Sequence, residues 1–200
     1  SGNGGWTTGG VSSSWELGEP QAEFIDTANS GVNAWVTNLT GQYPVSELSY
    51  IESPCFDFSS LSIDPIFEFA QIFNTEDCCD EGYVDISTDA GATWTRLGVA
   101  GEGTNWYNDA FNNEWDGESG DSTDWRIASH LLDSVAGESS VKIRKRCMTY
   151  IPAELRRKVT ELASNCCEHC RLSQDDYPFI FHMEHIISEK HDGETILENL

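Results

Sequence analysis

The residues with the most distinctive chemical spacing lie near the carboxyl end of the 200-residue chain. Cys167 and Cys170 form a C-x-x-C pair, and this spacing lets two thiolates reach one tetrahedral Zn²⁺. A structural zinc site needs four ligands, so the pair is only half of such a site. A redox pair or a chance arrangement would show the same spacing. Glu184 and His185 follow as neighbours, and Asn199 stands just before the last residue.

A helix and a strand are expected to position these side chains. Pro152 is a natural first helical residue, and the apolar spacing after it predicts an amphipathic helix over residues 152–164 that Asn165 ends. The basic run 156–158 lies mostly off the apolar stripe, where a solvated face is favoured over a phosphate contact. The apolar residues at helical spacing are Leu155, Val159 and Leu162.

Farther along, alternation predicts a strand that delivers Glu184 and His185 to its end. Gly193 then turns the chain, and Glu198, Asn199 and Leu200 close it. The alternating residues are Phe179, Phe181 and Met183 on one side and Ile180, His182 and Glu184 on the other.

Together with the helix, three stretches resemble the opening half of an HNH endonuclease, a member of the ββα-metal nuclease family. They are CEHC (167–170), FHMEHIISEKHDGET (181–195) and ENL (198–200). The resemblance covers residues 150–200. It implies hydrolysis of nucleic acid phosphodiester bonds, with DNA as the partner and Mg²⁺ or Mn²⁺ as the catalytic metal.

The resemblance also implies a role for each motif residue. His185 matches the general base that activates water, and Glu184 matches a ligand of the catalytic metal. Asn199 matches the asparagine that orients the loop bearing the base. Cys167 and Cys170 match the first pair of a structural zinc site, here a half site. The remaining histidines of this region are expected to be incidental: His169, His182 and His191.

This sequence departs from the family pattern after ENL. The family continues with a second C-x-x-C pair and a helix that carries the final metal ligand, whereas this sequence stops at Leu200. We therefore expect a small, incomplete α+β segment with little or no nuclease activity.

A change of composition near Arg146 predicts two modules. Residues 1–146 hold 6 Lys+Arg against 24 Asp+Glu, giving -18, and they carry all 7 Trp and 16 of the 17 Gly. Residues 147–200 hold 5 Lys+Arg against 10 Asp+Glu, which gives a net charge of -5, and they carry 4 of the 5 His. We therefore expect one domain at 1–146 and another at 147–200.

The first module is expected to be a jelly roll or β-sandwich, which makes the chain mainly β. In one segment Phe67, Phe69 and Phe73 share one face while Glu68 and Ala70 share the other, which is the period of a strand. Short candidate strands are separated by turn residues at the spacing of a sandwich: 34–39, 66–73, 83–87, 93–97, 125–131 and 141–144.

The segment S-x-D-x-G-x-T-W, at residues 87–94, looks like the Asp-box hairpin of sialidases and many secreted β proteins. Asp89 is expected to accept backbone N–H groups across the turn, Gly91 to supply a positive φ, and Trp94 to pack beneath the hairpin. The box is a structural device, and a single copy does not make a sialidase propeller.

Six stretches in order are similar to a MAM-like jelly-roll module of secreted or surface bacterial proteins, over residues 10–144. They are WELGEP, SGVNAWVTNLTGQY, SPCFDFS, VDISTDAGATW, NWYND and SSVKIR. The resemblance implies a noncatalytic accessory or adhesive domain with a glycan or protein ligand. Since the family pattern continues past VKIR into further strands, we expect the last strands to be missing and an edge to be open.

Cysteines, acidic residues and tryptophans of the first module leave alternatives open. Cys55 would either pair with Cys78 or Cys79 in an exported protein or be a small buried thiol. Two acidic groups would either bind Ca²⁺ or form solvated faces: Glu76, Asp77, Asp80 and Glu81, and Asp116, Asp121 and Asp124. Four tryptophans would either stack on sugar or fill the core: Trp6, Trp15, Trp106 and Trp115.

Composition narrows the function classes. The chain has no apolar run of the roughly eighteen residues that a membrane span needs. The net charge of -23 argues against a general polyanion binder, although most of that charge belongs to the first module. Two classes remain, a metal-dependent nuclease and a binding or adhesion module. The first module suggests that the protein is secreted or lies on the cell surface. If the HNH-like module is the native product, a cytoplasmic location is expected instead.

Overall fold

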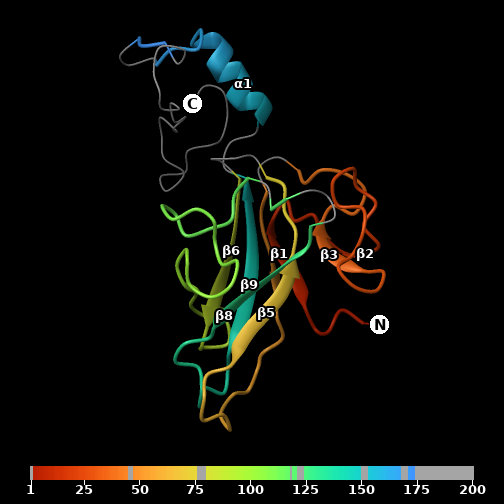
Figure 1. Cartoon of the computed structure of the whole chain (residues 1–200), viewed down its shortest axis with the longest axis vertical. Helices are drawn as coiled ribbons and strands as arrows, with labels where there is room; N and C mark the ends of the chain where they lie inside the picture. Colours follow the sequence, from red (N-terminus) through yellow and green to blue (C-terminus); the bar gives the residue numbers. More distant parts are fainter. Residues whose placement is uncertain are drawn as a thin grey trace. The chain divides into compact units, whose positions relative to one another are not determined.

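The computed structural model describes residues 2–44, 47–75, 80–117, 119–120, 124–149, 153–167 and 171–173. The chain divides into two compact units, Ser1–Tyr150 and Ile151–Leu200. The described strands lie in the first unit and the described helix lies in the second (Figure 1).

The strands of the first unit all pair in antiparallel fashion, so the prediction of a mainly β fold is confirmed. Their bounds are β1 (Thr7–Val11), β2 (Trp15–Gly18), β3 (Ala34–Thr37), β4 (Leu48–Glu52), β5 (Ile66–Gln71), β6 (Asp80–Ser87), β7 (Thr95–Arg96), β8 (Arg126–Leu131) and β9 (Lys142–Thr149).

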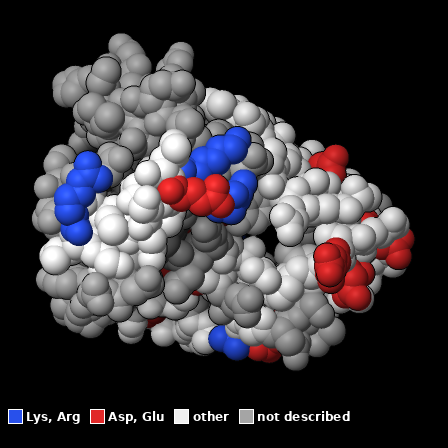
Figure 2. All heavy atoms as spheres, turned by 90° about the horizontal axis from the view of Figure 1, so that it is seen from above, with Lys and Arg blue, Asp and Glu red and all other residues white. Residues whose placement is uncertain are grey.

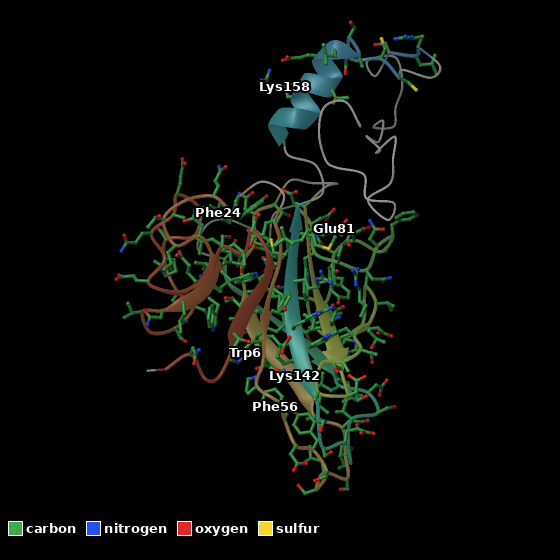
Figure 3. The ribbon with its side chains drawn as sticks, turned by 180° about the vertical axis from the view of Figure 1, so that it is seen from behind. Trp6, Phe24, Phe56, Glu81, Lys142 and Lys158 are labelled. Carbon is green, nitrogen blue, oxygen red and sulfur yellow. The ribbon has the colours of Figure 1, made fainter. Side chains whose placement is uncertain are left out.

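Strand β9 is the centre of a five-stranded sheet with the order β1-β4-β9-β6-β7. Its side chains alternate between the two faces, as the period of a strand requires. Ile143 and Cys147 are buried on the inner face, while Lys142 and Arg144 lie on the outer face and keep contact with solvent. Figure 3 shows Lys142 near one end of β9, close to Phe56, whose backbone bridges to the residue before this strand.

The inner face of this sheet is covered by the antiparallel pair β5–β8, and a further pair is formed by β2 and β3. Phe67 and Phe69 of β5 point to the core, whereas Glu68 between them is exposed, as the alternation predicted. Ala128 of β8 and Val84 of β6 are fully buried in the same core. The two layers therefore share one apolar interior.

Two tryptophans from the segment between β7 and β8 fill much of that interior. Trp106 is 2% exposed and Trp115 is 3% exposed, and their ring centroids lie 5.1 Å apart in an edge-to-face arrangement. The indole N–H of Trp106 donates to the Leu97 carbonyl at 3.0 Å, so the buried polar group is satisfied. Of the two alternatives for these residues, the core position is the one found.

Each of the six predicted strand segments contains an observed strand, with ends that differ by a few residues. Strands β1, β2 and β4 were not predicted. β1 contains Gly9 and Gly10, which carry no strand signal of their own. In β4 the buried face mixes polar and apolar residues, because Ser49 is buried beside Ile51 while Tyr50 between them is partly exposed.

The boundary between the units lies after Tyr150 and not at Arg146. The physical reason is that β9 continues through the predicted boundary. Cys147 and Met148 stand opposite β4 on one side and β6 on the other. The edges of the five-stranded sheet are β1 and β7.

The second unit contains helix α1 (Ala153–Leu162), close to the predicted range. The helix is terminated one residue before the predicted Asn165, by Ser164, which has φ at 55° and donates its N–H to the Glu161 carbonyl at 3.1 Å. Asn165 follows with φ at 55°, and its N–H donates to the Thr160 carbonyl at 2.9 Å. The predicted apolar stripe is wrong at Leu162, which is 70% exposed, because the buried residue at this end of the helix is Ala163.

Candidate functional site

Of the predicted nuclease and zinc residues, Cys167 belongs to the described part of the chain. Glu184, His185, Asn199 and Cys170 lie outside the described residues.

The backbone next to Cys167 forms a tight reversal. The Arg171 N–H donates to the Cys167 carbonyl at 2.7 Å, and the Cys167 N–H donates to the Leu172 carbonyl at 2.9 Å. Arg171 adopts a left-handed conformation with φ at 61°.

The Asp-box residues form the hairpin that the sequence predicted. Asp89 accepts the Thr93 N–H at 2.8 Å and the Thr93 hydroxyl at 2.6 Å. Gly91 has φ at 93°, and the Trp94 indole N–H donates to its carbonyl at 3.0 Å. The hydrogen bonds from Thr93, followed by the one from Ser87, lower the pKa of Asp89 to about 2. The box is a structural feature of the β6–β7 turn.

Basic residues of the first unit are packed against aromatic rings on the outer face of the sheet. The Arg144 guanidinium lies 4.2 Å from the Trp94 ring and is paired with Asp85 at 2.9 Å. Arg96 lies 3.5 Å from the Tyr83 ring. These cations are already engaged within the sheet. On the face shown in Figure 2, the basic side chains of the described residues form small separate groups and no continuous patch.

A cavity of about 170 Å³ opens beside the buried aromatic cluster, and this volume corresponds to about six water molecules. It combines flat apolar rings with amide, hydroxyl and guanidinium groups. Its lining residues come from the end of β5, the start of β8 and the segment between β7 and β8: Gln71, Phe73, Asn105, Tyr107, Asn108, Trp115, Ser119 and Arg126.

Several polar groups that line this cavity are held by the backbone. The Asn105 amide donates to the Ile127 carbonyl at 2.8 Å, and Asn108 makes two hydrogen bonds to the backbone of Asp116. The Tyr107 hydroxyl donates to the Leu97 carbonyl at 2.9 Å, and burial raises its pKa to about 12. The lining is therefore a rigid, pre-arranged surface.

Gln71 at the cavity is oriented by a lysine from the opposite sheet. Lys145 donates from Nζ to Gln71 Oε1 at 2.5 Å. The same Nζ lies 4.8 Å from the Phe69 ring and 4.6 Å from the Trp115 ring. Although the residue as a whole keeps some exposed surface, its ammonium group lies among these rings, and desolvation lowers its pKa to about 7.

Because Lys145 Nζ donates to Gln71 Oε1, the Gln71 oxygen faces the lysine and its NH₂ group faces away. Among the described residues, the enclosed side-chain nitrogens without a partner are Trp15 Nε1 and Arg146 Nε. Gln71 Nε2 is not among them, and Gln71 is one of the residues that line the cavity.

Sequence reasoning missed Gln71 and Lys145. Each interrupts a row of inward-facing residues: Gln71 follows Phe67 and Phe69 on the inner face of β5, and Lys145 follows Ile143 on the inner face of β9. A polar residue at an inward position of a strand was the available signal.

The other candidate sites of the first unit have mixed outcomes. Cys55 is an exposed, free thiol, so neither a disulfide nor a buried thiol describes it, whereas Cys78 and Cys79 lie outside the described residues. Within the described part of the chain, no three metal-ligating side chains gather. Asp80 accepts the Tyr43 hydroxyl at 2.6 Å, and Asp124 is paired with Arg126. Trp6 and Trp15 are partly buried.

No known protein family model matches the chain. A stretch of 97 residues, 48% of this chain, is 34% identical to Bacillopeptidase F of Bacillus subtilis (strain 168). The match covers 7% of that relative's length, so this chain corresponds to a small part of it. Because the matched stretch is longer than the second unit, it includes part of the first unit. None of the described helices is long and apolar enough to cross a membrane.

Proposed function

We propose that the first unit is a noncatalytic binding module that takes up a carbohydrate in the cavity beside Trp115. The observation that carries the proposal is the composition of the cavity, in which the partly exposed Phe73 ring lies with amide, hydroxyl and guanidinium groups. Sugars present apolar C–H faces that stack on aromatic rings and hydroxyl groups that pair with amides.

The polar side chains that line the cavity are of types that favour ligand binding over catalysis. Amide, phenol and guanidinium groups line the cavity, and none of the described lining residues is a carboxylate, histidine or cysteine. These are the side chains that most often move a proton or attack a substrate near neutral pH. The lining therefore suits recognition.

The match to part of Bacillopeptidase F supports an accessory role for such a module. The matched relative is a bacterial peptidase by its name, and a binding module attached to a degradative enzyme holds that enzyme near its substrate. We place the module outside the cell or on its surface, as the MAM-like resemblance implies.

The test is a titration of the full chain with a panel of neutral and acidic saccharides, followed by calorimetry and by amide chemical shifts. We expect binding with shifts at the cavity residues. Phe73→Ala removes a ring from the lining and should abolish binding, whereas Phe111→Ala removes a ring that is 91% exposed and outside the lining and should not. Absence of binding across the panel, or shifts far from the cavity, would contradict the proposal.

A second function is favoured by the reversal at Cys167. We propose that the second unit is a metal-dependent endonuclease module of the HNH kind. In it, Cys167 and Cys170 would hold structural Zn²⁺, and Glu184 would hold Mg²⁺ or Mn²⁺. The donor types fit these metals, since thiolates suit Zn²⁺ and a carboxylate suits the harder ions.

Within that module His185 would take a proton from water and Asn199 would hold the loop that bears it. A divalent metal held by Glu184 would polarise the phosphate and stabilise the leaving oxygen. The test measures bound zinc, and plasmid cleavage with Mg²⁺ or Mn²⁺, for wild type and two variants. Cys167→Ser should lose zinc. Because residues 150–200 resemble only the opening half of the family, we expect weak cleavage at most by the wild type, and His185→Ala should remove it. His191→Ala is the matched control.

Two outcomes would count against this second proposal. One is wild-type protein that binds no zinc. The other is plasmid cleavage that is equal in wild type and His185→Ala.

A further inference from the structure

We propose that the cavity selects a sugar that carries a carboxylate, such as a uronic acid, and that Gln71 and Arg126 receive this carboxylate. The proposal rests on the carbohydrate-binding function proposed above and adds the class of ligand. Three observations support it: the two residues stand next to each other, each has an N–H group without a described partner, and Arg126 carries a positive charge.

Gln71 and Arg126 stand directly opposite each other in the β5–β8 pair. Side chains at opposite positions point to the same face of a sheet, with their Cβ atoms about 5 Å apart. Both residues line the cavity. Two side chains from separate strands therefore present polar groups next to each other at one site.

Each of these residues has one donor group that no described residue uses. The Gln71 oxygen is taken by Lys145, which leaves the Gln71 NH₂ group turned away from that lysine. Arg126 donates from Nε and Nη2 to one oxygen of Asp124, at 3.0 Å and 2.7 Å, which leaves Nη1. Two adjacent N–H donors match the two oxygens of a carboxylate, and charge-assisted hydrogen bonds of this kind are strong.

The charges near the cavity also favour an anionic group. Among the described lining residues Arg126 is the one with a permanent charge. The Asp124 carboxylate already pairs with Arg126 and does not line the cavity. The net charge of -23 repels anions at long range, so salt should weaken that repulsion more than it weakens direct contacts.

Lys145 acts as a positioning residue in this scheme. It does not line the cavity, and its role is to hold the Gln71 oxygen so that the amide presents its NH₂ group to a ligand. Without it the amide is free to turn and offer its oxygen, which repels a carboxylate. Loss of Lys145 should therefore weaken the binding of acidic sugars more than that of neutral ones.

The experiment compares the methyl glycosides of glucuronic and galacturonic acid with those of glucose and galactose. Binding to the full chain is measured by calorimetry at matched ionic strength. We expect the uronides to bind about tenfold more tightly or better, as one charge-assisted hydrogen bond allows. Arg126→Gln should remove this preference, and Lys145→Met should reduce it, without a matching loss for neutral sugars. Arg157→Gln removes an exposed arginine of the second unit and should leave the preference for uronides unchanged.

The outcomes separate the two proposals. Equal binding of uronides and neutral glycosides would overturn the carboxylate inference and leave the carbohydrate-binding function in place. A uronide preference that survives in Arg126→Gln would overturn the assignment of the site. Absence of binding for every glycoside, at any of the salt concentrations used, would overturn both.

Discussion

Replacement of Lys145 should change how the stability of the first unit depends on pH. In the folded chain the pKa of Lys145 is lowered from 10.5 to about 7 by desolvation. The unfolded chain therefore binds more protons than the folded chain between these two pH values. Because stability rises with pH wherever the unfolded state holds more protons, wild-type stability gains a contribution as pH rises above about 7.

The size of this contribution follows from the proton difference. One proton corresponds to about 1.4 kcal/mol per pH unit, so the gain between about pH 7.5 and about pH 9 is about 2 kcal/mol. Burial raises the pKa of Cys147 from 9.0 to about 12, so this thiol begins to titrate in the unfolded chain near the top of the range, and it does so equally in wild type and in Lys145→Met. Lys145→Met should lack the gain. The lost hydrogen bond to Gln71 shifts its stability by a constant amount that does not change the slope.

The assay is urea unfolding at several pH values in this range, followed by tryptophan fluorescence. All 7 tryptophans lie in residues 1–146, so the signal reports on the first unit. Gln71→Met is the matched control, because it removes the same hydrogen bond and keeps the lysine, and it should retain the wild-type slope. Parallel stability profiles for wild type and Lys145→Met would refute the reasoning.

Three further predictions concern the core, the Asp box and the cysteines. Trp106→Ala removes a side chain that is 2% exposed and should lower the free energy of unfolding by about 3–5 kcal/mol in urea, and a loss below about 1 kcal/mol would contradict its place in the core. Asp89→Ala should lower the melting temperature near neutral pH. The difference from wild type should vanish as the pH falls through about 2, because the depressed pKa of Asp89 makes its stabilising contribution disappear there, and an equal difference at both pH values would contradict this. Under native conditions a thiol reagent should label Cys55, which is exposed, and spare Cys147, which is buried, as peptide mapping by mass spectrometry would show; equal labelling would contradict the fold around β9.

Local patterns predicted much of the β unit. The alternation of Phe67 and Phe69 with Glu68 predicted both the strand and its inner face. The Asp box was predicted in detail because its hydrogen bonds join residues within seven positions of one another. β1 was missed because its glycines have no side chains to alternate, and it is held by pairing with β4, some forty residues away.

The position of the unit boundary was misjudged for a related reason. Composition changes near Arg146, but strand pairing continues to Thr149, because β4 and β6 both need backbone partners on β9. Composition records which residues are present, whereas a sheet ends where its hydrogen-bond partners end.

The sequence by itself determined the mainly β character of the first unit, the Asp-box turn and the helix before the C-x-x-C pair, because each depends on neighbouring residues. Only the tertiary structure decided the candidate binding site. Gln71, Arg126 and Lys145 come from three strands that are far apart in the chain, and long-range register places them together. The lowered pKa of Lys145 likewise depends on rings from other segments, since desolvation is a property of the assembled core.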